Sequence, residues 1–160
     1  MHIKNLKSGF GMLEIIIGVA IISASLFSLI AVAQISLRFV GESTQNAKSG
    51  FLLEEGVEAI KFLRDSGWDV NIVPLVVNVS HYLNFNGTNW ESTSVNNYID
   101  GVFERSFVIE DVYRDSNDDI AASGTLDAGT KKVSVLVSWN TRSGTTTKNI
   151  STYITDIFGN

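Results

Sequence analysis

The chain has 160 residues, 44% of them hydrophobic, and a formal net charge of −5, which is the composition of one ordinary domain. It contains no cysteine, which excludes disulfides and thiolate metal sites, and its two histidines make a histidine-based metal or catalytic centre an unfavoured reading. The acidic balance argues against nucleic acid as a partner, because neutralising phosphates requires clustered lysine and arginine.

The charges are distributed unevenly along the chain. Residues 15–37 form a run of 23 without a charged side chain, whereas residues 42–160 contain 16 acids and 9 bases. As a helix rising about 1.5 Å per residue, this run extends roughly 35 Å, enough to cross a hydrocarbon core of about 30 Å. Lys4 and Lys7 lie in the first nine residues, which contain no acid. The positive-inside rule therefore predicts a single-pass membrane segment with a cytoplasmic N-terminus and an exported C-terminal part.

Glu14 is out of place at the start of this apolar segment. An ionised carboxylate at bilayer depth costs about 2.5 to 3.5 kcal/mol on insertion scales, so the side chain needs a partner unless it snorkels to the interface. It follows Lys7-Ser8-Gly9-Phe10 and three further residues. This combined spacing, followed by the uncharged run, is far more specific than a lone acid.

The pattern resembles the class III signal of type IV prepilins and type II secretion pseudopilins. In that family an inner-membrane aspartic peptidase cuts after the glycine of a short basic leader and methylates the new N-terminus. The resemblance implies cleavage between Gly9 and Phe10, N-methylation of Phe10, and a mature chain of 160 − 9 = 151 residues. It further implies that Glu14 accepts a charge-assisted hydrogen bond from the amine of a neighbouring subunit and so sets the register of assembly.

The same resemblance implies the partners and the location. The partners are the prepilin peptidase and methyltransferase, other pilin subunits in a helical filament, the inner membrane and its assembly platform. The location is the cell membrane and then an extracellular or periplasmic filament. Many major pilins have a proline midway along the membrane helix and a C-terminal disulfide, but here Ala31 occupies the proline position and cysteine is absent. A minor pilin or pseudopilin is the better interpretation.

Two further features of the apolar run leave alternatives open. Ala20, Ala24 and Ser28 recur every four residues, a row of small side chains that lets membrane helices approach closely, although such residues are common in any membrane helix. Ala31-Val32-Ala33 matches a signal-peptidase site, so the chain could instead be a secreted binding module released after Ala33. Against this, the apolar region is about twice the usual length and contains a glutamate.

Beyond the membrane run, the apolar spacing indicates that the helix continues. Two adjoining apolar rows fall at helical spacing, and most of the charged residues lie on the other side. The first row is Leu52, Gly56, Ala59 and Leu63, and the second is Leu53, Val57 and Ile60. We expect helix from Phe10 to about Asp65, with Gly67 suited to a left-handed cap.

The remaining chain predicts an antiparallel sheet. Residues 68–101 read as a variable loop region with one or two short strands at the apolar patches 72–79 and 82–85. Alternating apolar residues predict three better strands at 102–113, 132–139 and 149–158, with Ser143-Gly144 as the turn of the last hairpin. The amphipathic helix would cover the apolar face of this sheet.

The acidic linker 115–124 imitates the start of an EF-hand loop. Ile120 replaces the glycine that such a loop requires, and Leu126 falls where the bidentate glutamate belongs. A solvated hairpin loop is the commoner reading, and calcium binding elsewhere in the linker stays open.

The expected fold class is α+β and pilin-like, with a long N-terminal helix packed on an antiparallel sheet of about four strands. The segments are a leader (residues 1–9), a membrane and filament-core helix (10–37), an amphipathic continuation (38–67) and an exported β domain (68–160). A membrane-anchored hydrolase is disfavoured because the sequence has no nucleophile motif with a plausible histidine partner. We expect a structural subunit rather than an enzyme, with no cofactor.

Overall fold

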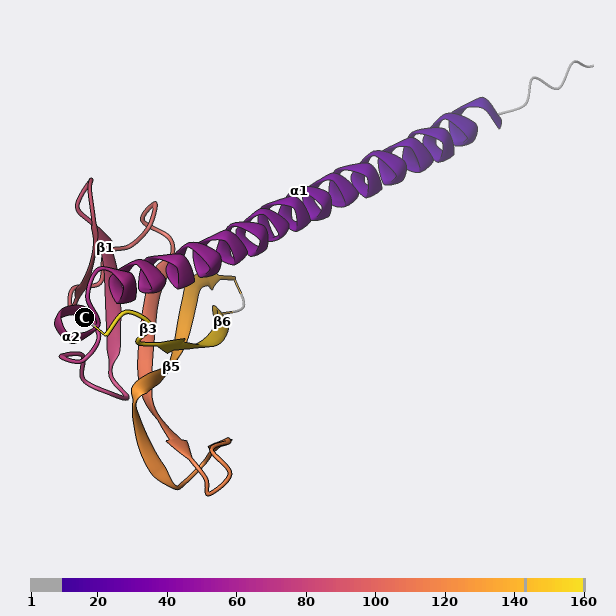
Figure 1. Ribbon diagram of the computed structural model, residues 1–160. Coiled ribbons are helices and arrows are strands. Elements are labelled where there is room, and N and C mark those ends of the chain that lie inside the picture. Colours follow the sequence, from indigo (N-terminus) through magenta and orange to yellow (C-terminus); the bar gives the residue numbers. More distant parts are fainter. Residues whose placement is uncertain (1–9, 143, 160) are drawn as a thin grey trace, which may run out of the picture. The chain divides into compact units, whose positions relative to one another are not determined.

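The computed structural model describes residues 10–142 and 144–159 and divides the chain into two compact units, one ending at Gln45 and one starting at Asn46. One helix, α1 (Phe10–Asp65), runs through both units, and all other elements belong to the second (Figure 1). These elements are α2 (Trp68–Asn71), β1 (Ser80–Phe85), β2 (Trp90–Thr93), β3 (Glu104–Arg114), β4 (Ile120–Ala121), β5 (Thr125–Thr141) and β6 (Gly144–Thr155).

The first unit is the N-terminal part of α1. The chain's one proline, Pro74, lies outside the helix, and leucine, alanine and isoleucine provide side chains compatible with a continuous helix. The predicted helix from Phe10 to Asp65 is confirmed at both ends. Its most apolar stretch has a mean hydropathy of 2.7, so α1 is long and apolar enough to span a membrane.

The second unit is built on an antiparallel sheet with the strand order β2-β1-β3-β5-β6, and β4 pairs with the end of β3. The α+β class and the antiparallel sheet are therefore confirmed, although the sheet has six strands rather than about four. The two longest pairings join β3 to β5 and β5 to β6. The sheet is thus centred on β3 and β5, with β6 along one edge.

The core lies between the inner face of this sheet and the C-terminal part of α1. Alternate residues of β3 and β5 turn toward the helix and are 0% exposed: Phe107, Ile109, Val133, Val135 and Val137. The helix contributes five buried apolar residues from the two predicted rows: Leu52, Leu53, Ala59, Ile60 and Leu63. The helical periodicity read from the sequence therefore identified the face that packs on the sheet.

Gly56 sets how closely the helix approaches the sheet. A Cβ atom at this position would lie 2.7 Å from Cγ1 of Val135 and 3.3 Å from Cδ of Arg105. Both neighbours are buried, so neither side chain has free space into which to move. The absence of a side chain at Gly56 is therefore a packing requirement.

Arg105 is a charged residue inside this interface and only 5% exposed. Its Nη1 atom lies 3.3 Å from Oε1 of Glu55 and donates to the carbonyl oxygen of Leu52 at 3.4 Å. Its guanidinium also stacks over the ring of Trp90, 5.1 Å from the centroid. The side chain thus joins α1, β3 and β2.

Residues 68–101 contain two short strands, β1 and β2, as expected, but the apolar patch 72–79 is not one of them. A short helix, α2, precedes it, and the amide of Ile72 donates to the carbonyl of Trp68 at 2.9 Å, so the chain is turning where the patch begins. Pro74 has no amide hydrogen for a ladder, and Asn78 has a φ of 60°. The segment is instead a turn that places Ile72 in the core and packs Leu75 and Val77 against it, while its other valines stay exposed.

Other boundaries also differ from the expectation. β5 begins seven residues before the predicted residue 132, because Thr125–Asp127 pair with the end of β3 after a register shift at Asp111/Val112. β6 begins at Gly144 and ends at Thr155, so residues 156–158 are not strand.

Gly67 has a positive φ of 142°, as a helix-terminating glycine permits, but its ψ of 109° is not that of a left-handed helical cap. Ser143, predicted in the last turn, lies outside the described residues.

Candidate functional site

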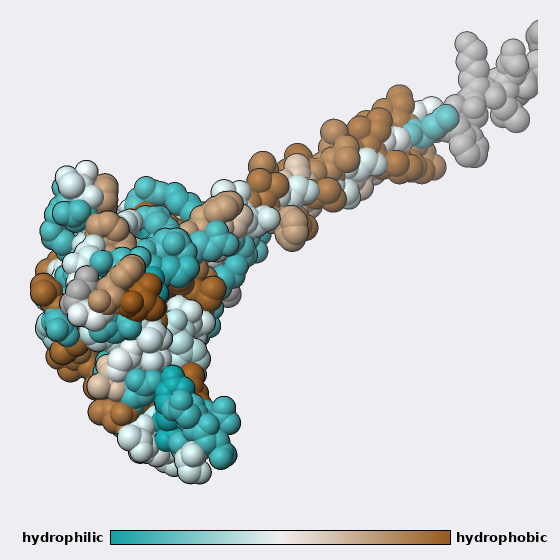
Figure 2. Space-filling view, in the orientation of Figure 1, coloured by the Kyte–Doolittle hydropathy of each residue, from teal (hydrophilic) through white to brown (hydrophobic). Residues whose placement is uncertain are grey.

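The first candidate site is the exposed apolar surface of the N-terminal part of α1 (Figure 2). None of the side chains from Met12 to Val40 is buried by the protein itself. Exposed fractions reach 77% at Met12, 73% at Phe27 and 74% at Leu37. Soluble monomeric proteins rarely leave so much contiguous apolar surface in water. This surface requires an apolar environment outside the chain.

Glu14 is exposed on this surface, and its carboxylate has no hydrogen bond or ion pair to any residue of 11–142 or 144–159. With about 100° of rotation per residue, Gly11 and Gly18 fall within roughly 60° of it around the helix axis. No atom lies within 4 Å of the position that a Cβ would take on either glycine. The surface beside Glu14 is therefore flat enough for another backbone to approach.

Two serine hydroxyls of this segment form hydrogen bonds within the helix. Ser25 donates to the carbonyl oxygen of Ile21 at 2.9 Å, and Ser28 donates to that of Ala24 at 2.8 Å. Both bonds span four residues within the helix, so neither hydroxyl needs water or another chain. Glu14 is the one charged residue among 11–37, and an ionised carboxylate has no proton to donate to a helix carbonyl in this way.

The predicted row of Ala20, Ala24 and Ser28 does not coincide with the Glu14 face. All three are exposed on the helix. A step of four residues turns by about 40°, so Ala20 lies about 120° from Glu14 and only Ser28 comes within about 40° of it. The small residues beside Glu14 are Gly11 and Gly18, which sequence reasoning missed because it searched for a period of four rather than the seven that separates these two.

The predicted processing site is only partly described. Phe10 is the first residue of α1, and Gly9, with the rest of the leader, lies outside the described residues. Cleavage after Gly9 and methylation of Phe10 therefore stay predictions.

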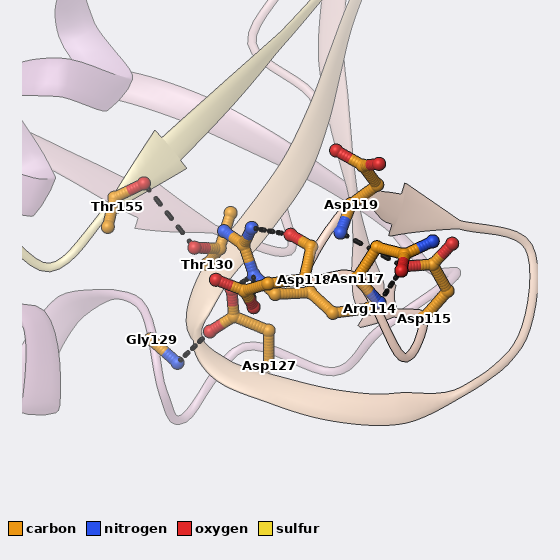
Figure 3. Close-up of polar contacts among 9 residues, drawn as sticks. All are labelled: Arg114, Asp115, Asn117, Asp118, Asp119, Asp127, Gly129, Thr130 and Thr155. Atoms are coloured by element: carbon orange, nitrogen blue, oxygen red, sulfur yellow. Dashed lines mark hydrogen bonds and ion pairs between the residues drawn. The ribbon is translucent and has the colours of Figure 1, made fainter.

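The second candidate site is the acidic loop between β3 and β5 (Figure 3). Oδ1 of Asp115 accepts the backbone amides of Asn117 at 2.8 Å and Asp119 at 3.1 Å. Nη1 of Arg114 donates to the carbonyl oxygen of Asp118 at 2.8 Å. The Asp115 carboxylate thus closes the turn between β3 and β4, in the manner of an Asx-turn.

Asp127 is bound to Arg114 rather than pointing into open space. Nε of Arg114 donates to its Oδ2 at 2.7 Å, and the amide of Gly129 donates to its Oδ1 at 3.1 Å (Figure 3). The hydrogen bond from Arg114 lowers the pKa of the Asp127 carboxyl, and the same hydrogen bond raises the pKa of Arg114. The pair links the ends of β3 and β5 next to the loop that joins the two strands.

This geometry gives the linker 115–124 a structural role that the sequence did not indicate. The expected solvated loop was read from its acids alone, and Arg114 and Asp127 are 13 residues apart, so only the β3–β5 pairing shows that they meet. Within residues 10–142 and 144–159, no three histidine, aspartate or glutamate side chains are grouped as metal ligands. Of the acids that imitate an EF-hand, Asp115 holds the turn together through its carboxylate.

No protein-family model, no curated protein and no solved structure matches the chain.

Proposed function

We propose that the chain is a type IV pilin-like structural subunit, most closely a minor pilin or a type II secretion pseudopilin. In this proposal it is held in the inner membrane by α1, cleaved after Gly9, and assembled through α1 into a helical filament with its β unit exported. The observation that carries the proposal is the long, wholly exposed apolar part of α1 with the unpartnered Glu14 near its start. The prepilin-like spacing from Lys7 to Glu14 supports it.

The exposed surface suits a segment that exchanges one apolar environment for another. Lipid covers such a helix before assembly, and other copies of the helix cover it in a filament, so apolar side chains stay out of water in both states. The internal hydrogen bonds of Ser25 and Ser28 hold in either environment. The carboxylate of Glu14 distinguishes the filament from the lipid, because a neighbouring subunit's N-terminal amine offers it a cation and lipid tails do not.

Glu14→Ala tests the proposed role of this carboxylate. Charge-assisted hydrogen bonds contribute about 1.5 to 3 kcal/mol, which corresponds to roughly a 10- to 140-fold loss of incorporation into filaments. Membrane insertion should be unchanged or improved, since the variant removes a charge from the apolar segment. The measurement is the amount of subunit in sheared filament fractions relative to the amount in membranes.

Glu54→Ala is the matched control, because Glu54 is an exposed acid on the same helix within the second unit. It should assemble as the unmodified chain does. Normal incorporation of the Glu14→Ala chain would refute the role proposed for Glu14. Glu14→Asp, which keeps the charge on a shorter side chain, should retain more incorporation than the alanine variant.

A further inference from the structure

A cavity of about 490 Å³ lies on the face of the sheet opposite to α1. It forms where the register shift at Asp111/Val112 bends β3 and the short strand β4 pairs with the end of β3. Four strands contribute to its lining: Tyr113 from β3, Ile120 from β4, Lys132 from β5 and Tyr153 from β6 are among the residues. Its volume lies in the range of about 300 to 1,000 Å³ that small-molecule sites occupy.

Each acid of this cavity is paired with a lysine, one from the lining and one from the neighbouring position of β5. Glu110, Lys132 and Tyr153 lie directly opposite each other on β3, β5 and β6, and Nζ of Lys132 donates to Oε2 of Glu110 at 3.0 Å. Asp111, the other acid of the lining, accepts a hydrogen bond from Nζ of Lys131 at 2.5 Å. Because each carboxylate has its own lysine, the cavity presents hydrogen-bonding groups without a net charge.

Two tyrosines stand at the cavity with much of their surface uncovered. Tyr153 is 49% exposed and Tyr113 is 36% exposed. Neither hydroxyl makes a hydrogen bond to any residue that the structure describes. Each ring therefore offers an apolar face together with a polar tip, the combination that makes tyrosine frequent at binding surfaces.

We propose that this cavity binds an uncharged saccharide. A sugar ring has an apolar C–H face, which can stack on the tyrosine rings, and hydroxyl groups at its edge, which can bond to the Glu110–Lys132 pair and to the tyrosine hydroxyls. A charged ligand finds no net opposite charge here, and a purely apolar ligand would bury the ion pair without replacing its contact with water. An extended peptide typically adds to a free strand edge, so it would bind along β6, the edge strand, rather than stack on the tyrosine rings of the cavity.

The test uses the full chain in detergent micelles, with neutral oligosaccharides of glucose, galactose and N-acetylglucosamine as probes at millimolar concentration. Saturation-transfer NMR should detect transfer from the protein to the ring protons of at least one probe. Tyr153→Ala should weaken that binding by roughly tenfold or more, and Tyr153→Phe, which keeps the ring face, should weaken it less. Tyr98→Ala is the control, because Tyr98 is 60% exposed and lies outside this cavity.

Thermal unfolding of each variant establishes that the β unit is intact, and Tyr113→Ala serves as a second variant if Tyr153→Ala does not fold. Absence of transfer from every saccharide with the folded protein would overturn the proposal. Binding that Tyr153→Ala and Tyr113→Ala leave unchanged would also overturn it. Stronger transfer to an uncharged peptide than to any saccharide, with the same dependence on Tyr153, would show that the ligand of this cavity is a peptide and not a saccharide. Filament assembly by the Tyr153→Ala chain is expected to be normal, so this test is separate from that of Glu14.

Discussion

At the scale of single residues, acids of the same type have different roles because their surroundings differ. Glu14 has no partner among the described residues and stands on an apolar surface, so its carboxylate is available to another molecule. Asp115 and Asp127 are both bonded within the hairpin, to backbone amides and, for Asp127, to Arg114. Glu14 is therefore a candidate for assembly, whereas Asp115 and Asp127 hold the fold.

Stability should depend on pH through Asp127. Because Arg114 lowers the pKa of Asp127 below its ordinary value of 3.8, the folded state binds fewer protons than the unfolded state at acid pH. The stabilisation is fully present above the unfolded pKa, near pH 4, and is lost as the pH falls through the folded pKa. Asp127→Asn should therefore unfold at a lower temperature than the unmodified chain at neutral pH, and this difference should close in acid.

Differential scanning calorimetry of the full chain in detergent at neutral and acid pH measures both parts of this prediction. Asp69→Asn is the control, since Asp69 is exposed on α2 and has no ion pair among the described residues. It should change the unfolding temperature little at either pH. A difference for Asp127→Asn that stays constant into acid would show that the ion pair contributes nothing to folding.

At the scale of elements, the contact between α1 and the sheet depends on one glycine and one arginine. Gly56 permits the close approach to Val135, and Arg105 crosses the interface to reach Glu55. Buried ion pairs add little net stability when desolvation is included. We therefore attribute the packing of α1 on the sheet mainly to the apolar side chains around Gly56.

Alanine at Gly56 and alanine at Gly50 should have opposite effects. In a helix interior, glycine to alanine stabilises by up to about 1 kcal/mol. At Gly50, where no atom lies within 4 Å of the added Cβ, this gain should appear as a higher unfolding temperature. At Gly56, overpacking against the buried Val135 costs about 1 to 3 kcal/mol, so the unfolding temperature should fall by several degrees. Equal shifts for the two variants in calorimetry would contradict this account of the interface.

At the scale of the whole molecule, the two units have different relations to solvent. The unit ending at Gln45 exposes apolar side chains throughout, whereas the unit from Asn46 onward buries its own core. The acids and bases of residues 42–160 lie almost wholly in the second unit. This division is what a subunit requires if one part stays in lipid or among other helices while the other part faces water.

The N-terminus of the mature chain separates the proposed subunit from a secreted binding module. Cleavage after Gly9 should yield a chain of 151 residues whose first residue is N-methylated Phe10, still carrying the apolar part of α1. Mass spectrometry of protein from the native membrane measures both the mass and the modification. A soluble form beginning at the unmodified Gln34 would instead support the secreted module. Gly9→Leu should block the first cleavage without affecting the second.

Elements with local apolar patterns could be predicted from the sequence, whereas contacts between residues distant along the chain could not. The run of 23 uncharged residues and the helical rows around Leu52 and Ile60 predicted α1 because these patterns depend only on the spacing within one element. Strands with alternating apolar residues, such as 132–139, were found for the same reason. The first residues of β5 were missed because they carry no such alternation and form a strand only by pairing with β3.

The sequence by itself determined the long apolar helix, the amphipathic face that packs on the sheet, the α+β class and the exceptional position of Glu14. Only the tertiary structure decided that 72–79 is a turn rather than a strand, that Arg114 binds Asp127, and that Tyr113 and Tyr153 line one cavity. The physical reason is the distance along the chain over which each signal acts. Periodicity reports on neighbours within one element, whereas each of these features needs a register, a turn or a bulge that brings separate segments together.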